Sequence, residues 1–295
     1  GAWRLLARIC YPFDLLAVQE VLDNLEGIRR LRDQVKLDSR RSMSLLVSDI
    51  AGERPGLAGD AERLAFLYDP RRIEHTELAA EITTDRSAVA ARLAERCEAY
   101  SRSLADFTAA RDAWRAAGEP AGERPGVGFP AFLTFIRPPH IGSFRIRARR
   151  GADPIDLIAV NAHLLYGDST DERLWEFLEL IEWLALRAKY PDRLYAPNLL
   201  LLGDCNLETA NLRDTIERER AAAGHPPDAA LATPRDFLNW KLKSLNKAVL
   251  TSRTSAEANF PLLDVHPRQG CLLTNARQEQ TYDQIGLFHR DPRLP

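Results

Sequence analysis

Short apolar runs recur along the whole chain, and this recurrence most limits what the sequence can fold into. Each run has the length of one strand, and NLLLLGD (198–204) is apolar at nearly every position, which is typical of a strand buried on both faces. We predict strands in the segments 13–21, 44–50, 62–69, 131–138, 143–149, 155–165, 198–204 and 281–288. Amphipathic or charged segments between them predict helices at about 24–36, 87–117, 170–189 and 209–223. Strands and helices alternate throughout the sequence. This alternation favours a single domain, residues 1–295, in which helices cover a sandwich of sheets, over separate domains.

The composition allows a large hydrophobic core and argues against several classes of protein. The 295 residues are 45% hydrophobic and carry a formal net charge of −2, so the chain has no overall basic charge that would point to nucleic acid. Four widely spaced cysteines, with no CxxC pair, indicate neither a zinc site nor a disulfide framework. No apolar run approaches the roughly 18 residues of a membrane span. We expect a reduced, cytoplasmic protein.

Polar side chains stand at or near the ends of four of these strands. They are Gln19 with Glu20, Asn161 with His163, Asp204 with Asn206, and Asp283 with Gln284. Each pair alone is explained as well by a solvated strand end, a turn, or a histidine satisfied within the core. Together they offer carboxylate and amide oxygens, which suit a hard cation such as Mg²⁺ or Mn²⁺. They also include an imidazole, which can donate to a phosphate or move a proton.

Other catalytic signatures are missing from the sequence. It contains no GxxxxGK[ST] loop, no GxGxxG fingerprint and no GxSxG elbow, so phosphate-loop, dinucleotide and serine-hydrolase chemistry have no support. A hard cation at the polar strand ends would neutralise a phosphate and steady an attacking water. Phosphate-ester chemistry is therefore the hypothesis that fits these residues.

Five motifs, in this order along the chain, resemble the endonuclease/exonuclease/phosphatase superfamily, the group of deoxyribonuclease I-like proteins. They are DLLAVQEV, ERLAFLYD, VNAHLLYGD, LLLLGDCNLE and YDQI, and the resemblance spans about residues 3–288. A helical stretch near 76–128 interrupts it and looks like an insertion. The resemblance implies an α+β fold, a four-layer α/β/β/α sandwich of two mainly antiparallel sheets flanked by helices. It places the active site at one edge of the sandwich.

The resemblance also implies a role for each matching residue. Glu20 matches the metal-binding glutamate of the family, and His163 the histidine that contacts the scissile phosphate. Asp204 matches the aspartate that orients or deprotonates the attacking water, and Asn206 its phosphate-binding neighbour. Asp283 matches an aspartate that supports a catalytic histidine or a metal. The implied cofactor is Mg²⁺ or Mn²⁺.

Other family positions are less well matched. Arg63 lies where many relatives carry an arginine, either as a structural residue or as one that faces the phosphate. The family begins with a strand that carries a metal-binding asparagine, and this strand has no counterpart here. The family's final Ser-Asp-His strand has none either, because His289 lacks the preceding Ser-Asp pair. We expect both terminal strands to lie outside the recorded chain; the other interpretation is a member that has lost catalysis.

Three functions remain open from the sequence. The leading hypothesis is a metal-dependent nuclease that hydrolyses DNA or RNA by in-line attack of a water positioned by the metal and Asp204. The second keeps this chemistry but acts on a small phosphorylated molecule or a lipid headgroup, which the weakly acidic charge favours. The third is an inactive scaffold that binds a protein partner through the helical insertion at about 76–128.

Overall fold

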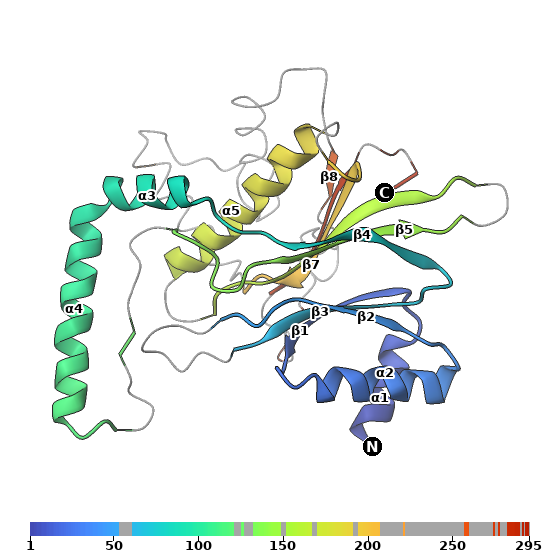
Figure 1. Cartoon of the computed structure of the whole chain (residues 1–295), viewed down its shortest axis with the longest axis horizontal. Coiled ribbons are helices and arrows are strands. Elements are labelled where there is room, and N and C mark those ends of the chain that lie inside the picture. The colour runs from blue at the N-terminus through green and yellow to red at the C-terminus, as the bar shows by residue number, and fades with distance from the viewer. Residues whose placement is uncertain are drawn as a thin grey trace.

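Two β-sheets packed face to face form the centre of the molecule, and helices cover their outer faces (Figure 1). This computed structural model describes residues 1–52, 61–120, 125–126, 132–148, 152–166, 170–190, 194–206, 221, 257–259, 274, 277, 282–289, 291 and 293–294. The three-stranded sheet has the order β1-β3-β2, and the six-stranded sheet the order β4-β5-β6-β7-β9-β8. Neighbouring strands are antiparallel except for β6 and β7. The expected sandwich of two mainly antiparallel sheets flanked by helices is confirmed.

The described helices and strands alternate irregularly along the chain. They are α1 (Ala2–Cys10), β1 (Leu15–Val21), α2 (Glu26–Ser39), β2 (Ser44–Val47), β3 (Arg63–Tyr68), β4 (Ile73–Glu81), α3 (Arg86–Glu95), α4 (Cys97–Ala116), β5 (His140–Ile146), β6 (Ile155–His163), α5 (Thr170–Lys189), β7 (Asn198–Asp204), β8 (Glu257–Asn259) and β9 (Asp283–His289). No helix in the described ranges is long and apolar enough to cross a membrane.

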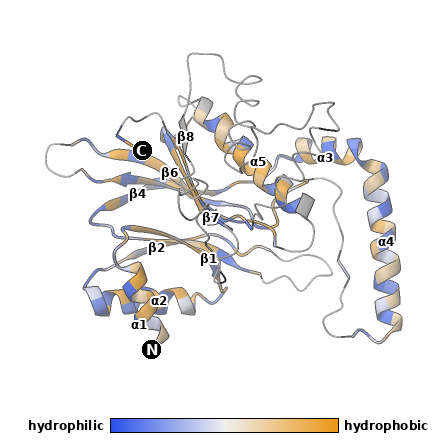
Figure 2. Ribbon diagram, turned by 180° about the vertical axis from the view of Figure 1, so that it is seen from behind, coloured by the Kyte–Doolittle hydropathy of each residue, from blue (hydrophilic) through white to orange (hydrophobic). Residues whose placement is uncertain are grey.

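Alternation along the strands distributes the apolar side chains among three layers. In β3, Ala65 and Leu67 pack under α1 and α2, whereas Phe66 packs between the sheets against Phe144 of β5. In β6, every second residue from Ile158 to Ala162 packs under α5, and the intervening residues face the other sheet. Figure 2 shows the resulting apolar strands between the two sets of helices. Each sheet therefore packs against helices on one face and against the other sheet on the opposite face. The apolar packing involves the middles of the strands, so polar groups can lie at the strand ends.

Three elements were not predicted, because their sequence signal is weak: α1, β4 and β8, which is three residues long. Helix α1 is only nine residues long, and α1 contributes a single fully buried residue, Ala7. Strand β4 lies at the edge of its sheet and is mostly polar, with only Ile73 buried. Residues 76–81 of the expected insertion thus belong to a sheet, and the helical part begins at Arg86.

Two other predictions differ from the structure. The predicted strand at 131–138 is wrong for the described residues 132–138, which form bends and irregular chain. This segment ends in Pro138 and is followed by Pro139, and proline cannot donate to a strand ladder. The predicted helix at 87–117 is two helices, because the chain turns at Arg96 between α3 and α4. Helix α4 buries no residue and stands away from the sandwich (Figures 1 and 2). The predicted helix at 209–223 falls almost entirely outside the described residues.

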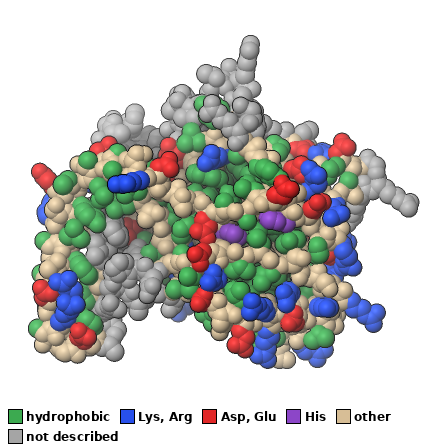
Figure 3. Space-filling model, viewed as in Figure 1, with side chains coloured by type: hydrophobic (Ala, Val, Ile, Leu, Met, Phe, Trp, Pro, Cys, Tyr) green, Lys and Arg blue, Asp and Glu red, His purple; other side chains and the backbone are tan. Residues whose placement is uncertain are grey.

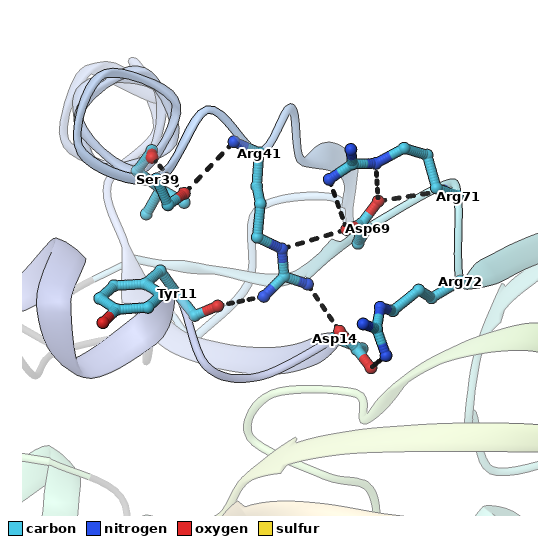
Figure 4. Close-up of polar contacts among 8 residues, drawn as sticks. Tyr11, Asp14, Ser39, Arg41, Asp69, Arg71 and Arg72 are labelled. Atoms are coloured by element: carbon cyan, nitrogen blue, oxygen red, sulfur yellow. Dashed lines mark hydrogen bonds and ion pairs between the residues drawn. The ribbon is translucent and has the colours of Figure 1, made fainter.

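A cluster of arginines and aspartates joins the start of β1 to the turn after β3 (Figure 4). Arg41 donates to Asp69 Oδ2 at 3.1 Å, to Asp14 Oδ1 at 2.6 Å and to the carbonyl oxygen of Tyr11. Arg71 donates to the same Asp69, whose side chain is 1% exposed. Asp69 is therefore the buried acceptor that both arginines need.

We expect Asp69→Asn to destabilise the protein by about 3 kcal/mol, because the largely buried Arg41 loses its buried charge partner and keeps the more exposed Asp14. Urea unfolding followed by circular dichroism measures this loss. Asp33→Asn is the matched control, since Asp33 pairs with Arg32 in an exposed bond and should change stability by less than about 0.5 kcal/mol. Equal losses in the two variants would contradict the role given to Asp69.

Candidate functional site

Three of the residues singled out from the sequence lie in one row across the six-stranded sheet. His163 at the end of β6 is directly opposite Asp204 at the end of β7, and Asp204 is directly opposite Asp283 at the start of β9. Directly opposed side chains point to the same face of a sheet. Asn161 lies two residues before His163 and therefore points to the same face. Because Asn161 donates to carbonyl oxygens of the three-stranded sheet, this face is the one turned toward that sheet. The row therefore lies at one edge of the sandwich, where the two sheets meet.

Glu20 reaches this edge from the other sheet on a β-bulge. The β1–β3 register is regular through Val18↔Ala65 and then shifts before Val21↔Arg63. Glu20 has a φ of 57°, which is in the left-handed region that non-glycine residues rarely adopt. Bulges bend a strand and re-aim a side chain, and they are frequent beside active sites. Glu20 is exposed as a result, although it lies in a strand with apolar neighbours.

The sequence analysis missed Glu62, which holds the histidine of the row. Glu62 Oε1 lies 2.5 Å from Nδ1 of His163, and both side chains are buried. An ionised carboxylate only accepts, so in this pairing Nδ1 carries the proton and Nε2 is left for a substrate. Glu62 is the first residue of the ERLAFLYD motif, so the motif that carries the family resemblance also contains this residue.

Arg137 is a second residue that the sequence analysis did not single out. Its Nε lies 3.1 Å from Glu62 Oε1, and its side chain is 13% exposed. The pair is not aligned as a hydrogen bond, and Arg137 Nη1 is buried with no hydrogen-bond partner among the described residues. A buried donor without a partner is costly, which is a feature of sites that receive an anionic ligand. No motif distinguishes Arg137 from the many other arginines of the sequence.

Negative charge accumulates around Asp204. Burial raises the pKa of this carboxyl above its ordinary value, and the charges of Asp283 and Glu20 add to the increase. A backbone hydrogen bond from Asn206 and the charge of His163 act in the opposite direction. Figure 3 shows acidic and histidine side chains next to each other on the face turned to the viewer. A bound cation would relieve this repulsion.

The donor set fits a hard cation that keeps most of its waters. No group of three or more His, Cys, Asp or Glu side chains in the described part of the chain is arranged to hold a metal by itself. Mg²⁺ is usually held by one or two carboxylates together with waters and substrate oxygens, so a complete protein cage is not required. Glu20 is the residue of this edge that would hold such an ion.

Asn206 follows β7 in a left-handed conformation, with a φ of 49°, and its side chain turns inward. It is 3% exposed, and its Nδ2 donates to the carbonyl oxygen of Leu164 at 2.9 Å. Its backbone N–H donates to Asp204 Oδ1 at 3.0 Å. In the structure, Asn206 thus holds the carboxylate of Asp204 and the chain after β6 in place.

Arg63 is the one predicted residue that is occupied elsewhere. Its guanidinium donates to Asp23 at 2.5 and 3.0 Å, to the carbonyl oxygen of Ser48 at 3.0 Å and to Asp49 at 3.4 Å. The hydrogen bond with Asp23 is the main reason why the pKa of Arg63 is raised. These contacts favour the structural alternative for Arg63 over the one that faces a phosphate.

His140 lies beside the site, opposite Asn161 in the sheet, and is 3% exposed. Neither ring nitrogen makes a hydrogen bond of ordinary geometry with a described residue. Burial lowers its pKa to about 4, the nearby backbone of Ala80 opposes this shift in part, and the charge of His75 adds to it. The folded protein therefore holds His140 neutral.

Stability should fall as the pH drops from about 6.5 to about 4, because the unfolded chain binds a proton at His140 in this window and the folded protein does not. We expect this group to account for up to about 3 kcal/mol. Urea unfolding of the wild type and of His140→Leu at several pH values isolates the effect as the difference between the two curves. Parallel pH curves would show that His140 is not the group responsible.

Three solved structures show what the chain is similar to. A protein of unknown function from Enterococcus faecalis V583 matches with a TM-score of 0.36 and 18% identity over 70% of this chain. A humanized D. rerio TDP2 matches with a TM-score of 0.46 and 13% identity over 99% of this chain and 78% of its own length. An endonuclease/exonuclease/phosphatase family protein from Bacteroides thetaiotaomicron matches with a TM-score of 0.37 and 12% identity over 70% of this chain.

The chain spans 58% of the length of the Enterococcus protein and 55% of that of the Bacteroides protein. The Bacteroides protein is described as a member of the family that the sequence motifs resemble. No family model and no curated protein matches the sequence. At these TM-scores and identities the matches carry no argument about activity.

Proposed function

We propose that this protein is a divalent-metal-dependent phosphodiesterase whose substrate is a nucleic acid. One observation carries the proposal: His163, Asp204 and Asp283 form a row across three strands, and the charge of the bulged Glu20 acts on the same Asp204. A solvated strand end explains any one of these residues, but it does not explain their convergence from both sheets. Carboxylates repel one another, so bringing Glu20 and Asp283 near Asp204 has an electrostatic cost that a bound cation would remove.

In this proposal each side chain has a role that its position allows. Mg²⁺ or Mn²⁺ held by Glu20 would neutralise charge on the phosphate. Asp204 orients a water and accepts its proton as the new P–O bond forms in line with the bond that breaks. His163 would act as an imidazolium, which donates from Nδ1 to Glu62 and from Nε2 to a phosphate oxygen. Asp283 keeps the edge anionic beside the metal position.

The phosphate also needs donors from the protein. Arg137 Nη1 is buried near Glu62 with no hydrogen-bond partner in the described ranges, and we assign it this role in place of Arg63. The remaining amide hydrogen of Asn206 is a second donor for the phosphate, since within the described residues its Nδ2 donates to the carbonyl oxygen of Leu164 alone.

A small phosphate ester is the second candidate substrate, and the charges beside the site favour it. Arg63 is paired with Asp23 and Asp49, and Arg137 with Glu62. Binding along a nucleic-acid strand normally uses several uncommitted cations, which release counterions from the phosphates. The described residues next to the row offer few such cations.

Hydrolysis assays test both candidates in one experiment. The substrates are bis-p-nitrophenyl phosphate, plasmid DNA, single-stranded DNA and p-nitrophenyl phosphate, each with EDTA, Mg²⁺ or Mn²⁺. We expect metal-dependent cleavage that is lost in Glu20→Gln, and a preference for DNA over the small esters. Cleavage of the small esters alone would favour the second candidate. A folded wild type that is inert towards all four would contradict the proposal and favour a binding scaffold.

The Glu62–His163 pair gives a separate prediction. Glu62→Gln should lower kcat by about 10²-fold, because the neutral amide no longer stabilises positive charge on the imidazole. Steady-state kinetics with bis-p-nitrophenyl phosphate measure the change. Glu74→Gln is the control, since Glu74 pairs with Arg147 on the surface at 3.4 Å and should leave kcat unchanged. A wild-type kcat in Glu62→Gln would mean that His163 does not act in catalysis.

A further inference from the structure

Asn161 is a buried side chain of the six-stranded sheet whose hydrogen bonds all go to the other sheet. It is 0% exposed and lies two residues before His163 in β6. Its Nδ2 donates to the carbonyl oxygen of Val18 at 3.1 Å and to that of Ala65 at 2.9 Å. Its Oδ1 accepts from Nε2 of Gln19 at 2.6 Å. Both amide hydrogens and the amide oxygen are therefore engaged by β1 and β3.

These contacts coincide with the bulge that carries Glu20. Val18↔Ala65 is the last regular pair of the β1–β3 ladder before the register shifts, and Asn161 binds the carbonyls of both residues. A bulge disrupts the ladder, and a buried backbone carbonyl needs a partner. The amide of Asn161 supplies that partner from outside the sheet.

The bulge decides on which side of β1 Glu20 lies. Val18 and Val21 both pack in the apolar cluster under α1 and α2, and two residues separate them instead of the one that strand alternation requires. Without the bulge, Val18 and Glu20 would share a face, and the carboxylate would point toward the helix layer. With it, Val21 is buried under the helices and Glu20 is exposed at the edge.

We propose that Asn161 is the positioning residue of this site: by binding the Val18 and Ala65 carbonyls and the Gln19 side chain, it holds the bulge that presents Glu20 beside His163 and Asp204. This inference rests on the proposed function, because it assigns Glu20 to a divalent cation. Asn161 itself touches neither the metal nor the substrate. It couples the two sheets so that one residue of β1 and two strand ends of the other sheet share one site.

Binding of Mn²⁺ to the protein without substrate tests this role, followed by electron paramagnetic resonance. We expect Asn161→Leu to raise the Kd for Mn²⁺ by about 10-fold or more, and Gln19→Met, which removes one of the three hydrogen bonds, to raise it by about 3-fold. Asn198→Leu is the matched control. Asn198 is 1% exposed, and its Nδ2 donates to the carbonyl oxygen of Asp156 at 2.8 Å at the far end of the same sheet. Asn198→Leu should lose stability in urea but keep the wild-type Kd.

Each outcome decides the inference. A wild-type Kd in a folded Asn161→Leu, or an equal rise in Asn198→Leu, would overturn it. If Asn161→Leu does not fold, Gln19→Met decides: a raised Kd supports the role of the amide, and an unchanged one refutes it. A wild type that neither binds Mn²⁺ nor hydrolyses phosphodiesters is a failure of the proposed function instead, so the two failures are distinguishable.

Discussion

Asp204→Asn should lower the rate of metal-dependent phosphodiester hydrolysis by about 10³-fold while the fold is retained. The amide has the shape of the carboxylate and still accepts the backbone hydrogen bond from Asn206, but it cannot take a proton from water. Initial rates with bis-p-nitrophenyl phosphate in Mg²⁺ and Mn²⁺ measure the loss.

Stability should move in the opposite direction in the same variant. Burial and the charges of Asp283 and Glu20 raise the pKa of Asp204, so its ionised form is disfavoured in the folded protein as the pH rises through that pKa. A neutral amide removes this cost, and the unfolding free energy at pH 7 should be equal to or above that of the wild type. Asp156→Asn is the control, since Asp156 pairs with Arg145 in an exposed ion pair away from the row. Equal activity of Asp204→Asn and Asp156→Asn would show that the site has been misplaced.

Gly203→Ala should destabilise the protein by about 3 kcal/mol or more and abolish any activity of the row. Gly203 is buried in β7 opposite Ala162 of β6, and a Cβ added there would meet the carbonyl oxygen of Ala162 at 2.2 Å. Backbone cannot move aside as a flexible side chain can, so β6 and β7 would have to separate next to His163 and Asp204. Urea unfolding and the yield of soluble protein measure the effect.

Gly27→Ala provides the matched control for this glycine. Gly27 lies in α2, and the nearest atom to an added Cβ is in the ring of Trp3, at an ordinary 3.7 Å. The exchange should stabilise the protein by about 0.5–1 kcal/mol, because alanine is the better helix former. A loss at Gly27 equal to that at Gly203 would mean that the close approach of β6 and β7 is not the cause.

The sequence predicted those parts of the fold whose signal is local and strong. Strands β6 and β7 are long apolar runs, and α5 has an apolar face, so each could be placed within a few residues. Strand β4 was missed because a polar edge strand has no such run. The strand predicted at 131–138 is wrong because an apolar run alone does not make a strand. The described part of this run is irregular chain, and its Phe135 is buried in the apolar cluster under α5.

For the site, the residue types were readable, but their partners were not. Glu20, His163, Asp204 and Asp283 stand out because each interrupts or ends an apolar strand. Arg137 has no local signal, and Glu62 has only its place at the start of the ERLAFLYD motif, because the importance of both comes from contacts with residues far away in the sequence. Arg63 was ambiguous in the sequence, and its bonds to Asp23, Ser48 and Asp49 account for it.

The sequence by itself determined the strongly apolar strands, the amphipathic helix α5 and the polar groups that follow the apolar runs, because burial and alternation act over a few neighbouring residues. Only the tertiary structure decided that His163, Asp204 and Asp283 stand opposite one another, that β1 bulges at Glu20, and that Glu62 holds His163. These outcomes depend on strand register and on pairs such as Asn161 with Val18, 143 positions apart. Such pairs form only when both sheets pack together, and no local pattern records which residue will meet which.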